Sequence, residues 1–189
     1  MRLCISPILL LFFLSILLSD DKTYHLDHAA RVEFPVKIWS AGDTSGVSDC
    51  WGYVDKEGND YAIVGVLDGT AIVRVQDLKV ITTISGPEYG DMYYHRDMMT
   101  YGDHLYVCHE MTGTNQGVNI IDLSPLPDSV RYVKSYDNLD YAGSYATTSH
   151  NLFVDEATAT LYLVRASYDG FRVVSLDDPE NLKEIGVAE

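Results

Sequence analysis

One pattern of short apolar strands occurs three times along this chain of 189 residues. Each copy contains a first strand, a second strand rich in Val, Leu and Tyr, and a third strand that follows a glycine. Those glycines are Gly69, Gly117 and Gly170, so the copies are spaced by 48 and 53 residues. A period of about 40–50 residues with four short strands per copy is typical of β-propeller blades. The sequence therefore predicts an all-β protein with about three four-stranded antiparallel blades.

We expect the blades to span about residues 49–85, 95–137 and 150–187, within one partial β-propeller over residues 36–189. Their central strands contain few polar residues, as strands that are packed on both faces do. Three blades do not close a ring, because closed propellers have at least four. We therefore expect the N-terminal portion of a larger propeller. A ring closed by self-association of open blades and an open three-blade solenoid remain alternatives.

The start of the chain has the pattern of an export signal. Arg2 precedes an apolar run over residues 3–18, and Asp20 follows it closely. This order is typical of a secretory signal peptide, and the run is shorter than the roughly 20 residues of a membrane-spanning helix. We expect a signal peptide over residues 1–19, a polar tail over residues 20–35, and no transmembrane domain. The protein is then secreted, extracellular or attached to the cell surface.

The charge of the chain limits its partners. The formal net charge is −15, whereas binding to nucleic acid phosphates needs clustered Lys and Arg. The sequence therefore predicts no nucleic acid partner and leaves an extracellular protein or a glycan as the class of ligand.

Two cysteines remain once Cys4 has left with the signal peptide, namely Cys50 and Cys108. An even number in an oxidising compartment permits one disulfide. The Cα atoms of a disulfide must lie within about 7 Å, a distance that neighbouring blades can exceed. A Cys50–Cys108 disulfide and two small buried thiols are therefore the alternatives.

Four segments resemble the choice-of-anchor B family of LVIVD-repeat propellers. They are Ser48–Asp55, which reads Ser-Asp-Cys-Trp-Gly-Tyr-Val-Asp, Gly69–Val73, His95–Met98 and Ser149–Glu156. The strand that gives the repeat its name corresponds here to residues 71–75, 119–123 and 172–176. The resemblance covers residues 36–187 and implies a surface or extracellular propeller without an established catalytic activity.

Polar side chains stand at the beginning of the first strand of each predicted blade: Asp49, His95, Asp97, His150 and Asn151. First strands line the channel of a propeller, so these groups are expected to converge at one mouth. Carboxylate and amide oxygens suit calcium, and imidazole suits transition metals, so a divalent metal is one interpretation. The other is that these groups cap loops and satisfy backbone donors between blades.

Tyrosine is frequent, with 14 residues, and several tyrosines fall in the long connections between blades. Tyrosine gives a large amphipathic contact area, which is typical of binding surfaces. We expect a ligand-binding face that contains Tyr93, Tyr94, His95, Tyr145 and His150. Packing of these tyrosines between blades is the alternative.

The end of the second strand of the second predicted blade contains Cys108, His109 and Glu110. A His beside a carboxylate is a candidate for acid–base chemistry, and the alternative is an ordinary strand-end pair in contact with solvent. Neighbouring strand residues point to opposite faces, so Cys108 and His109 do not form a nucleophile and its base.

These observations predict an exported β-propeller that acts as a binding or scaffolding module, with no catalytic activity expected. The alternative is a metal-dependent hydrolase with a metal in the channel, held by residues from the set Asp49, His95, Asp97, His150 and Asn151. Nothing in the sequence resembles a serine-protease triad, a phosphate-binding glycine loop or a zinc signature.

Overall fold

The computed structural model of the protein describes residues 28–38, 44–87, 95–111, 113, 115–137, 148–164 and 170–188. The chain divides into two units, residues 1–31 and 32–189. Of the first unit only residues 28–31 are described, and they form no strand or helix. The predicted signal peptide over residues 1–19 lies outside the described residues. None of the described segments forms a helix that could span a membrane.

Three four-stranded antiparallel sheets make up most of the second unit, and in each the strands are hydrogen-bonded in chain order. Sheet 1 contains β3 (Val47–Val54), β4 (Asp60–Val66), β5 (Gly69–Arg74) and β6 (Lys79–Ser85). Sheet 2 contains β7 (Arg96–Tyr101), β8 (His104–His109), β9 (Val118–Asp122) and β10 (Arg131–Tyr136). Sheet 3 contains β11 (Asn151–Asp155), β12 (Thr160–Val164), β13 (Phe171–Ser175) and β14 (Lys183–Ala188). The short strands β1 (Lys37–Ile38) and β2 (Thr44–Ser45) pair before them.

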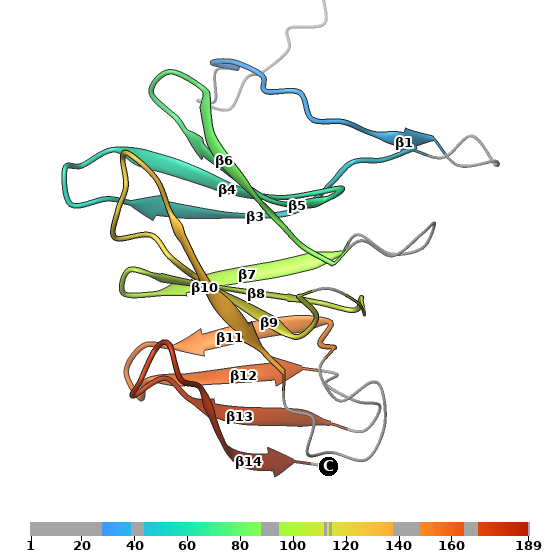
Figure 1. The fold of residues 1–189 in the computed structure, drawn as a ribbon, viewed down its shortest axis with the longest axis vertical. Coiled ribbons are helices and arrows are strands. Elements are labelled where there is room, and N and C mark those ends of the chain that lie inside the picture. The colour runs from blue at the N-terminus through green and yellow to red at the C-terminus, as the bar shows by residue number, and fades with distance from the viewer. Residues whose placement is uncertain are drawn as a thin grey trace, which may run out of the picture. The chain divides into compact units, whose positions relative to one another are not determined.

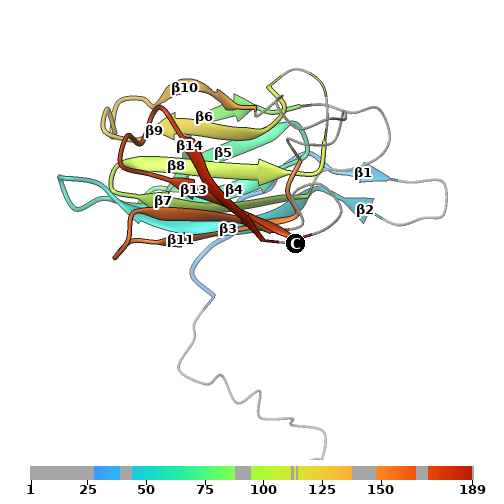
Figure 2. The ribbon, with the colours of Figure 1, turned by 90° about the horizontal axis from the view of Figure 1, so that it is seen from below.

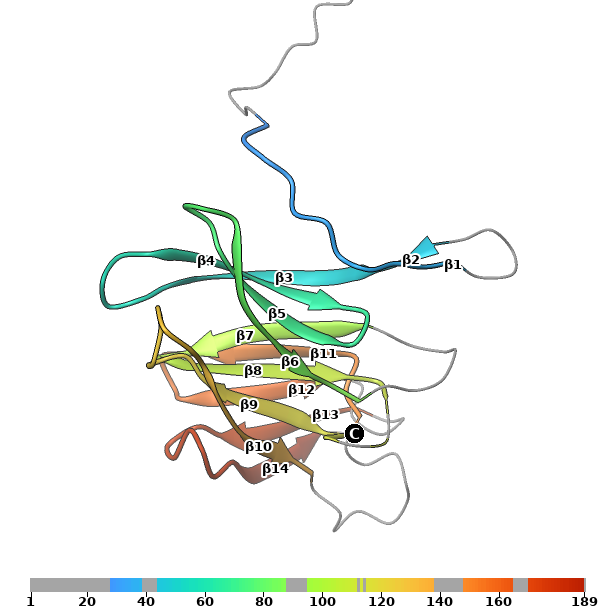
Figure 3. The ribbon, with the colours of Figure 1, turned by 45° about the horizontal axis from the view of Figure 1, so that its top comes forward.

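The three sheets are stacked in chain order, as Figure 1 shows. Strand β7 contacts both β3 and β11, so the first strands of the three sheets lie side by side. Seen along the stack, these first strands lie along one side and β6 and β10 lie along the other (Figure 2). Figure 3 shows the same order in a tilted view. The prediction of an all-β structure with four-stranded, blade-like sheets is confirmed.

The turns that follow the first strands are built in two ways. In sheet 1, Asp55 accepts hydrogen bonds from the backbone N–H groups of Glu57 and Asn59 at 2.8 and 2.9 Å, and from the Tyr61 hydroxyl at 2.9 Å. Burial alone would raise the pKa of Asp55, but these donors outweigh it and lower the pKa to about 2. Sheet 2 instead uses a two-residue turn whose Gly102 has a φ of 55°, a left-handed conformation that suits glycine.

Apolar side chains fill both spaces between the sheets. We call the face that a sheet turns toward the next sheet in chain order its forward face, and the opposite one its backward face. One cluster joins sheets 1 and 2 and includes Tyr61, Ile63, Ile72, Met98, Leu105, Val107 and Ile121. A second cluster joins sheets 2 and 3 and includes Tyr106, Cys108, Val118, Ile120, Leu152, Leu161, Leu163 and Val174.

Strand β8 shows why sheet 2 needs both neighbours. Leu105 and Val107 belong to the cluster with sheet 1, whereas Tyr106 and Cys108 belong to the cluster with sheet 3. All four are buried. A strand covered on both faces has no polar alternation, and this explains the continuous apolar run in the sequence.

Hydrogen bonds between side chains and neighbouring sheets fix the order of the stack. The Trp51 indole donates to the Thr100 hydroxyl at 3.0 Å, and the Tyr53 hydroxyl donates to Asp103 at 2.8 Å. Between sheets 2 and 3, the Tyr106 hydroxyl donates to the Pro179 carbonyl at 3.0 Å. These bonds satisfy the polar atoms of large aromatic residues that pack between the sheets, half-buried at Trp51 and Tyr53 and fully buried at Tyr106.

We predict that Leu161→Ala lowers the free energy of unfolding by about 2–5 kcal/mol, because it removes a large buried side chain between sheets 2 and 3. The control is Ile185→Ala in the same sheet, where the side chain is 58% exposed and the expected change is within about 0.5 kcal/mol. Urea unfolding followed by circular dichroism measures both. Equal losses in the two variants would contradict the packing described.

Candidate functional site

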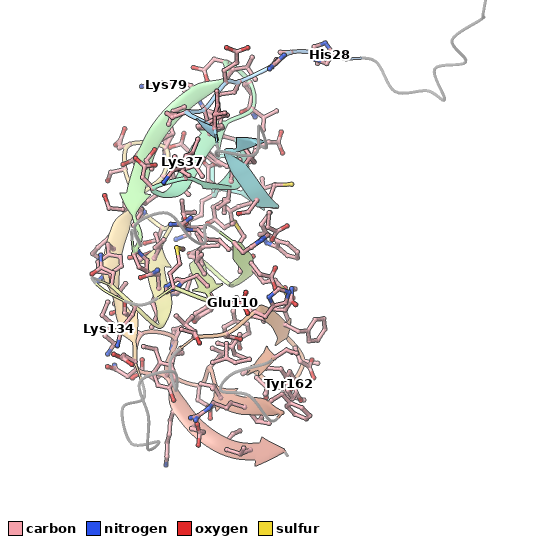
Figure 4. All side chains as sticks on the ribbon, turned by 90° about the vertical axis from the view of Figure 1, so that its right-hand side faces the viewer. His28, Lys37, Lys79, Glu110, Lys134 and Tyr162 are labelled. Atoms are coloured by element: carbon pink, nitrogen blue, oxygen red, sulfur yellow. The ribbon has the colours of Figure 1, made fainter. Side chains whose placement is uncertain are left out.

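The polar residues predicted from the sequence gather at one end of the first strands. Asp49 lies in β3, Asp97 in β7, and Asn151 begins β11. His95 and His150 directly precede β7 and β11. Figure 4 views the stack from the side on which these strands begin, with Glu110 labelled.

Asp97 ties the first strand of sheet 2 to that of sheet 3. Its Oδ2 accepts a hydrogen bond from the Leu152 backbone N–H at 2.7 Å and lies 3.3 Å from the Asn151 side-chain amide nitrogen, which donates to it. Its Oδ1 accepts from the backbone N–H of Met98 at 3.0 Å. The carboxylate therefore satisfies backbone donors between sheets, as the capping interpretation predicts.

Asp49 occupies the corresponding place between sheets 1 and 2. Its carboxyl group contacts Asp97 and accepts from the backbone N–H groups of Cys50 and Met98. Burial raises the pKa of Asp49, and the nearby Asp97 carboxylate raises it further. Asp49 and Asp97 thus each bond to the backbone of the next first strand, and together they form a close carboxyl pair.

Two histidines lie beside this carboxyl pair on the surface. The ring centroids of His95 and His150 are 6.4 Å apart. Nδ1 of His150 lies 3.0 Å from a carboxylate oxygen of Glu110, which follows β8 in sheet 2. In the sequence Glu110 stands beside His109, and nothing there predicts its pairing with His150, because only the stacking of sheets 2 and 3 brings Glu110 to His150.

The divalent metal predicted for Asp49, His95, Asp97, His150 and Asn151 finds no supporting arrangement. Among the described residues, no group of three or more His, Cys, Asp or Glu side chains could hold a metal ion. Asp97 instead bonds to backbone and amide donors, and His150 pairs with Glu110. The site residues come together in pairs rather than around one point.

The predicted ligand-binding face is described only in part. His95 and His150 are exposed at the end of the stack. Tyr93, Tyr94 and Tyr145 lie outside the described residues.

Of the two alternatives for the cysteines, the Cys50–Cys108 disulfide is absent, and both residues are free thiols. Cys108 is buried on the forward face of sheet 2, in the cluster with sheet 3. Cys50 is exposed on sheet 1 and is paired with Val64, which makes the expectation of two buried thiols wrong for Cys50. The thiols are kept apart because sheet 2 turns its backward face, not the face that carries Cys108, toward sheet 1.

His109 is buried rather than in contact with solvent, so the strand-end interpretation was wrong for this residue. Its Nδ1 accepts a hydrogen bond from the Met111 backbone N–H at 3.2 Å. Across the ladder it pairs with Arg96, whose guanidinium donates to the Val66 carbonyl at 2.6 Å. Burial, and then the positive charge of Arg96, lower the pKa of His109 to about 4. His109 is therefore a neutral core residue at neutral pH.

A polar groove on sheet 2 had no signal in the sequence. It has a volume of about 550 Å³ and is lined by Gly113, Asn115, Gln116, Tyr132, Val133, Lys134, Ser135 and Asp137. Gln116 donates to Asp137 at 2.9 Å. The lining holds one carboxylate, Asp137, and no histidine or cysteine.

Comparisons with protein-family models, with curated proteins and with solved structures find no match for this chain.

We predict that stability falls as the pH is lowered from about 6.5 to 4. The pKa of His109 is 6.5 when unperturbed and about 4 in the fold. The unfolded state therefore binds a proton at a higher pH than the folded state does. The free energy of unfolding, which is highest above pH 6.5, falls by about 3 kcal/mol as the pH is lowered to 4. Urea unfolding at a series of pH values measures this loss. His109→Gln should flatten the curve in this window, and an unchanged slope in that variant would refute the assignment to His109.

A second prediction concerns the carboxyl pair. Asp97→Asn keeps an acceptor for the Leu152 N–H and removes the repulsion from Asp49, so the free energy of unfolding should be unchanged or higher. Asp97→Ala leaves the buried donor without an acceptor and should cost about 1–3 kcal/mol. NMR titration of Asp49 should show a lower pKa in Asp97→Asn than in the wild type. An Asp49 pKa that does not move would contradict the contact.

Proposed function

We propose that the chain is an exported β-propeller segment that acts as a binding or scaffolding module outside the cell. Three stacked four-stranded sheets support the propeller assignment. The resemblance to the choice-of-anchor B family supports the extracellular location. The ligand, an extracellular protein or a glycan, binds at the end of the stack where the first strands begin.

The observation that carries this proposal is the pair of exposed histidines from two neighbouring sheets. His95 and His150 stand 6.4 Å apart, and Glu110 adds a carboxylate to the same surface. Imidazole and carboxylate groups at this spacing offer donors and acceptors to a polar ligand. Beneath them, Asp49 and Asp97 fix the strand ends, so the surface is held before the ligand arrives.

The alternative, a metal-dependent hydrolase, has no specific observation in its favour. The described His, Cys, Asp and Glu residues contain no metal-holding group. A bound metal measured by mass spectrometry at one ion per chain, and its loss in Asp97→Asn, would support the hydrolase instead.

The test is binding of the purified chain to a panel of immobilised polysaccharides and secreted proteins. We expect a ligand to emerge and His150→Ala to weaken its binding about tenfold, or about 1.4 kcal/mol. The matched control is His104→Ala, because His104 also lies near a glutamate, Glu180, at 3.4 Å but stands at the other end of β7 and β8. Binding that survives His150→Ala, or that falls equally in the control, would overturn the assignment of the surface.

A further inference from the structure

The forward face of sheet 3 is apolar, aromatic and exposed. Phe153 in β11 is 55% exposed, Val164 in β12 is 42% exposed, and Phe171 in β13 is 38% exposed. Tyr162, labelled in Figure 4, lies between the two phenylalanine rings, with centroid distances of 6.4 Å to Phe153 and 6.0 Å to Phe171. Such a contiguous apolar surface marks an interaction site more often than scattered exposed residues do.

The same positions in sheets 1 and 2 are buried against the next sheet. Ile63, Tyr106 and Tyr162 hold one place in the three second strands, since their third-strand partners Ile72, Ile120 and Val173 each lie three residues after the glycine of the repeat. Ile63 and Tyr106 are both 0% exposed. Two residues further on, Gly65 and Cys108 are also buried, whereas Val164 is 42% exposed. Every sheet therefore has a forward face built to be covered by another sheet.

A polar residue at the edge of the forward face also recurs in sheets 2 and 3. Asp97 pairs with Cys108, and Asn151 pairs with Val164, so Asn151 stands on sheet 3 where Asp97 stands on sheet 2. Asp97 accepts the backbone N–H of the next first strand at 2.7 Å. The amide oxygen of Asn151 is likewise an acceptor for a backbone N–H group of a neighbouring first strand.

The backward face of sheet 1 is the matching surface. Where sheets 2 and 3 have Thr100 and Val154, sheet 1 has Gly52, and where they have Leu105 and Leu161, it has Ala62. A Cβ atom added at Gly52 would meet nothing within 4 Å. Val54, on the same strand and face, is 57% exposed. The smaller side chains leave room for the larger aromatic set of sheet 3.

We propose that the forward face of sheet 3 binds the backward face of sheet 1 of a second copy of this chain. The contact repeats, between copies, the packing that joins sheets 1, 2 and 3 within one copy. The contact is heterologous because it uses two different surfaces. Two copies therefore close a ring if the rotation from sheet to sheet allows it, and otherwise further copies add to form an open filament. The apolar residues of the forward face, Phe153, Tyr162 and Phe171, are distinct from the histidine end proposed to bind ligand, and Asn151, the polar residue at its edge, directly follows His150.

The test uses light scattering after size exclusion on the full chain, with circular dichroism to check folding. We expect a mass of at least two chains for the wild type. Phe153→Lys, on the forward face, and Gly52→Lys, on the backward face, should each give the mass of a single folded chain. The control is Ile38→Lys, an exposed apolar position in β1 on neither face, which should keep the wild-type mass.

Mixing distinguishes this contact from any symmetric one. Phe153→Lys retains a good backward face and Gly52→Lys retains a good forward face, so an equimolar mixture should form a one-to-one pair. A single-chain mass for the wild type, a wild-type mass for either face variant, or a mixture that stays single would overturn the proposal. If Phe153→Lys fails to fold, Tyr162→Lys on the same face replaces it in both measurements.

Discussion

The burial of apolar side chains on both faces of sheet 2 holds the described part of the second unit together. Leu105 and Val107 on one side of β8 and Tyr106 and Cys108 on the other belong to two different clusters. Sheets 1 and 3 contribute the other half of each cluster, and each has only one face covered in this way. The stability of the stack therefore depends on the middle sheet, because unfolding it exposes both clusters at once.

The polar end of the stack follows from this packing. Stacking places β3, β7 and β11 side by side, and only then do Asp49 and Asp97 reach the backbone of the next strand. These bonds tie the strands at the point where the exposed histidines begin. The carboxylates are consequently part of the support, and the exposed imidazoles are the groups that we propose contact a ligand.

The sequence was a good guide to the sheets and a poor one to the pairings between them. The three-fold pattern of short strands predicted the antiparallel sheets, since strands that follow one another closely in the chain pair as hairpins. The place of His109 in the core, and the choice of His150 as partner of Glu110, depend on which sheet lies next to which. Strand patterns carry no such information. The state of the two cysteines could not be predicted for the same reason, because only the stacking of the sheets defines the faces on which Cys50 and Cys108 lie.

Amide hydrogen exchange, at a dilution where the chain has the mass of one copy, tests the central role of sheet 2 most directly. Strands β8 and β9 should exchange most slowly, at the rate of global unfolding, since both of their faces are covered. Strands β12 and β13, with one face open to water, should exchange faster. Equal protection of β8 and β12 under these conditions would contradict a stack that depends on the middle sheet.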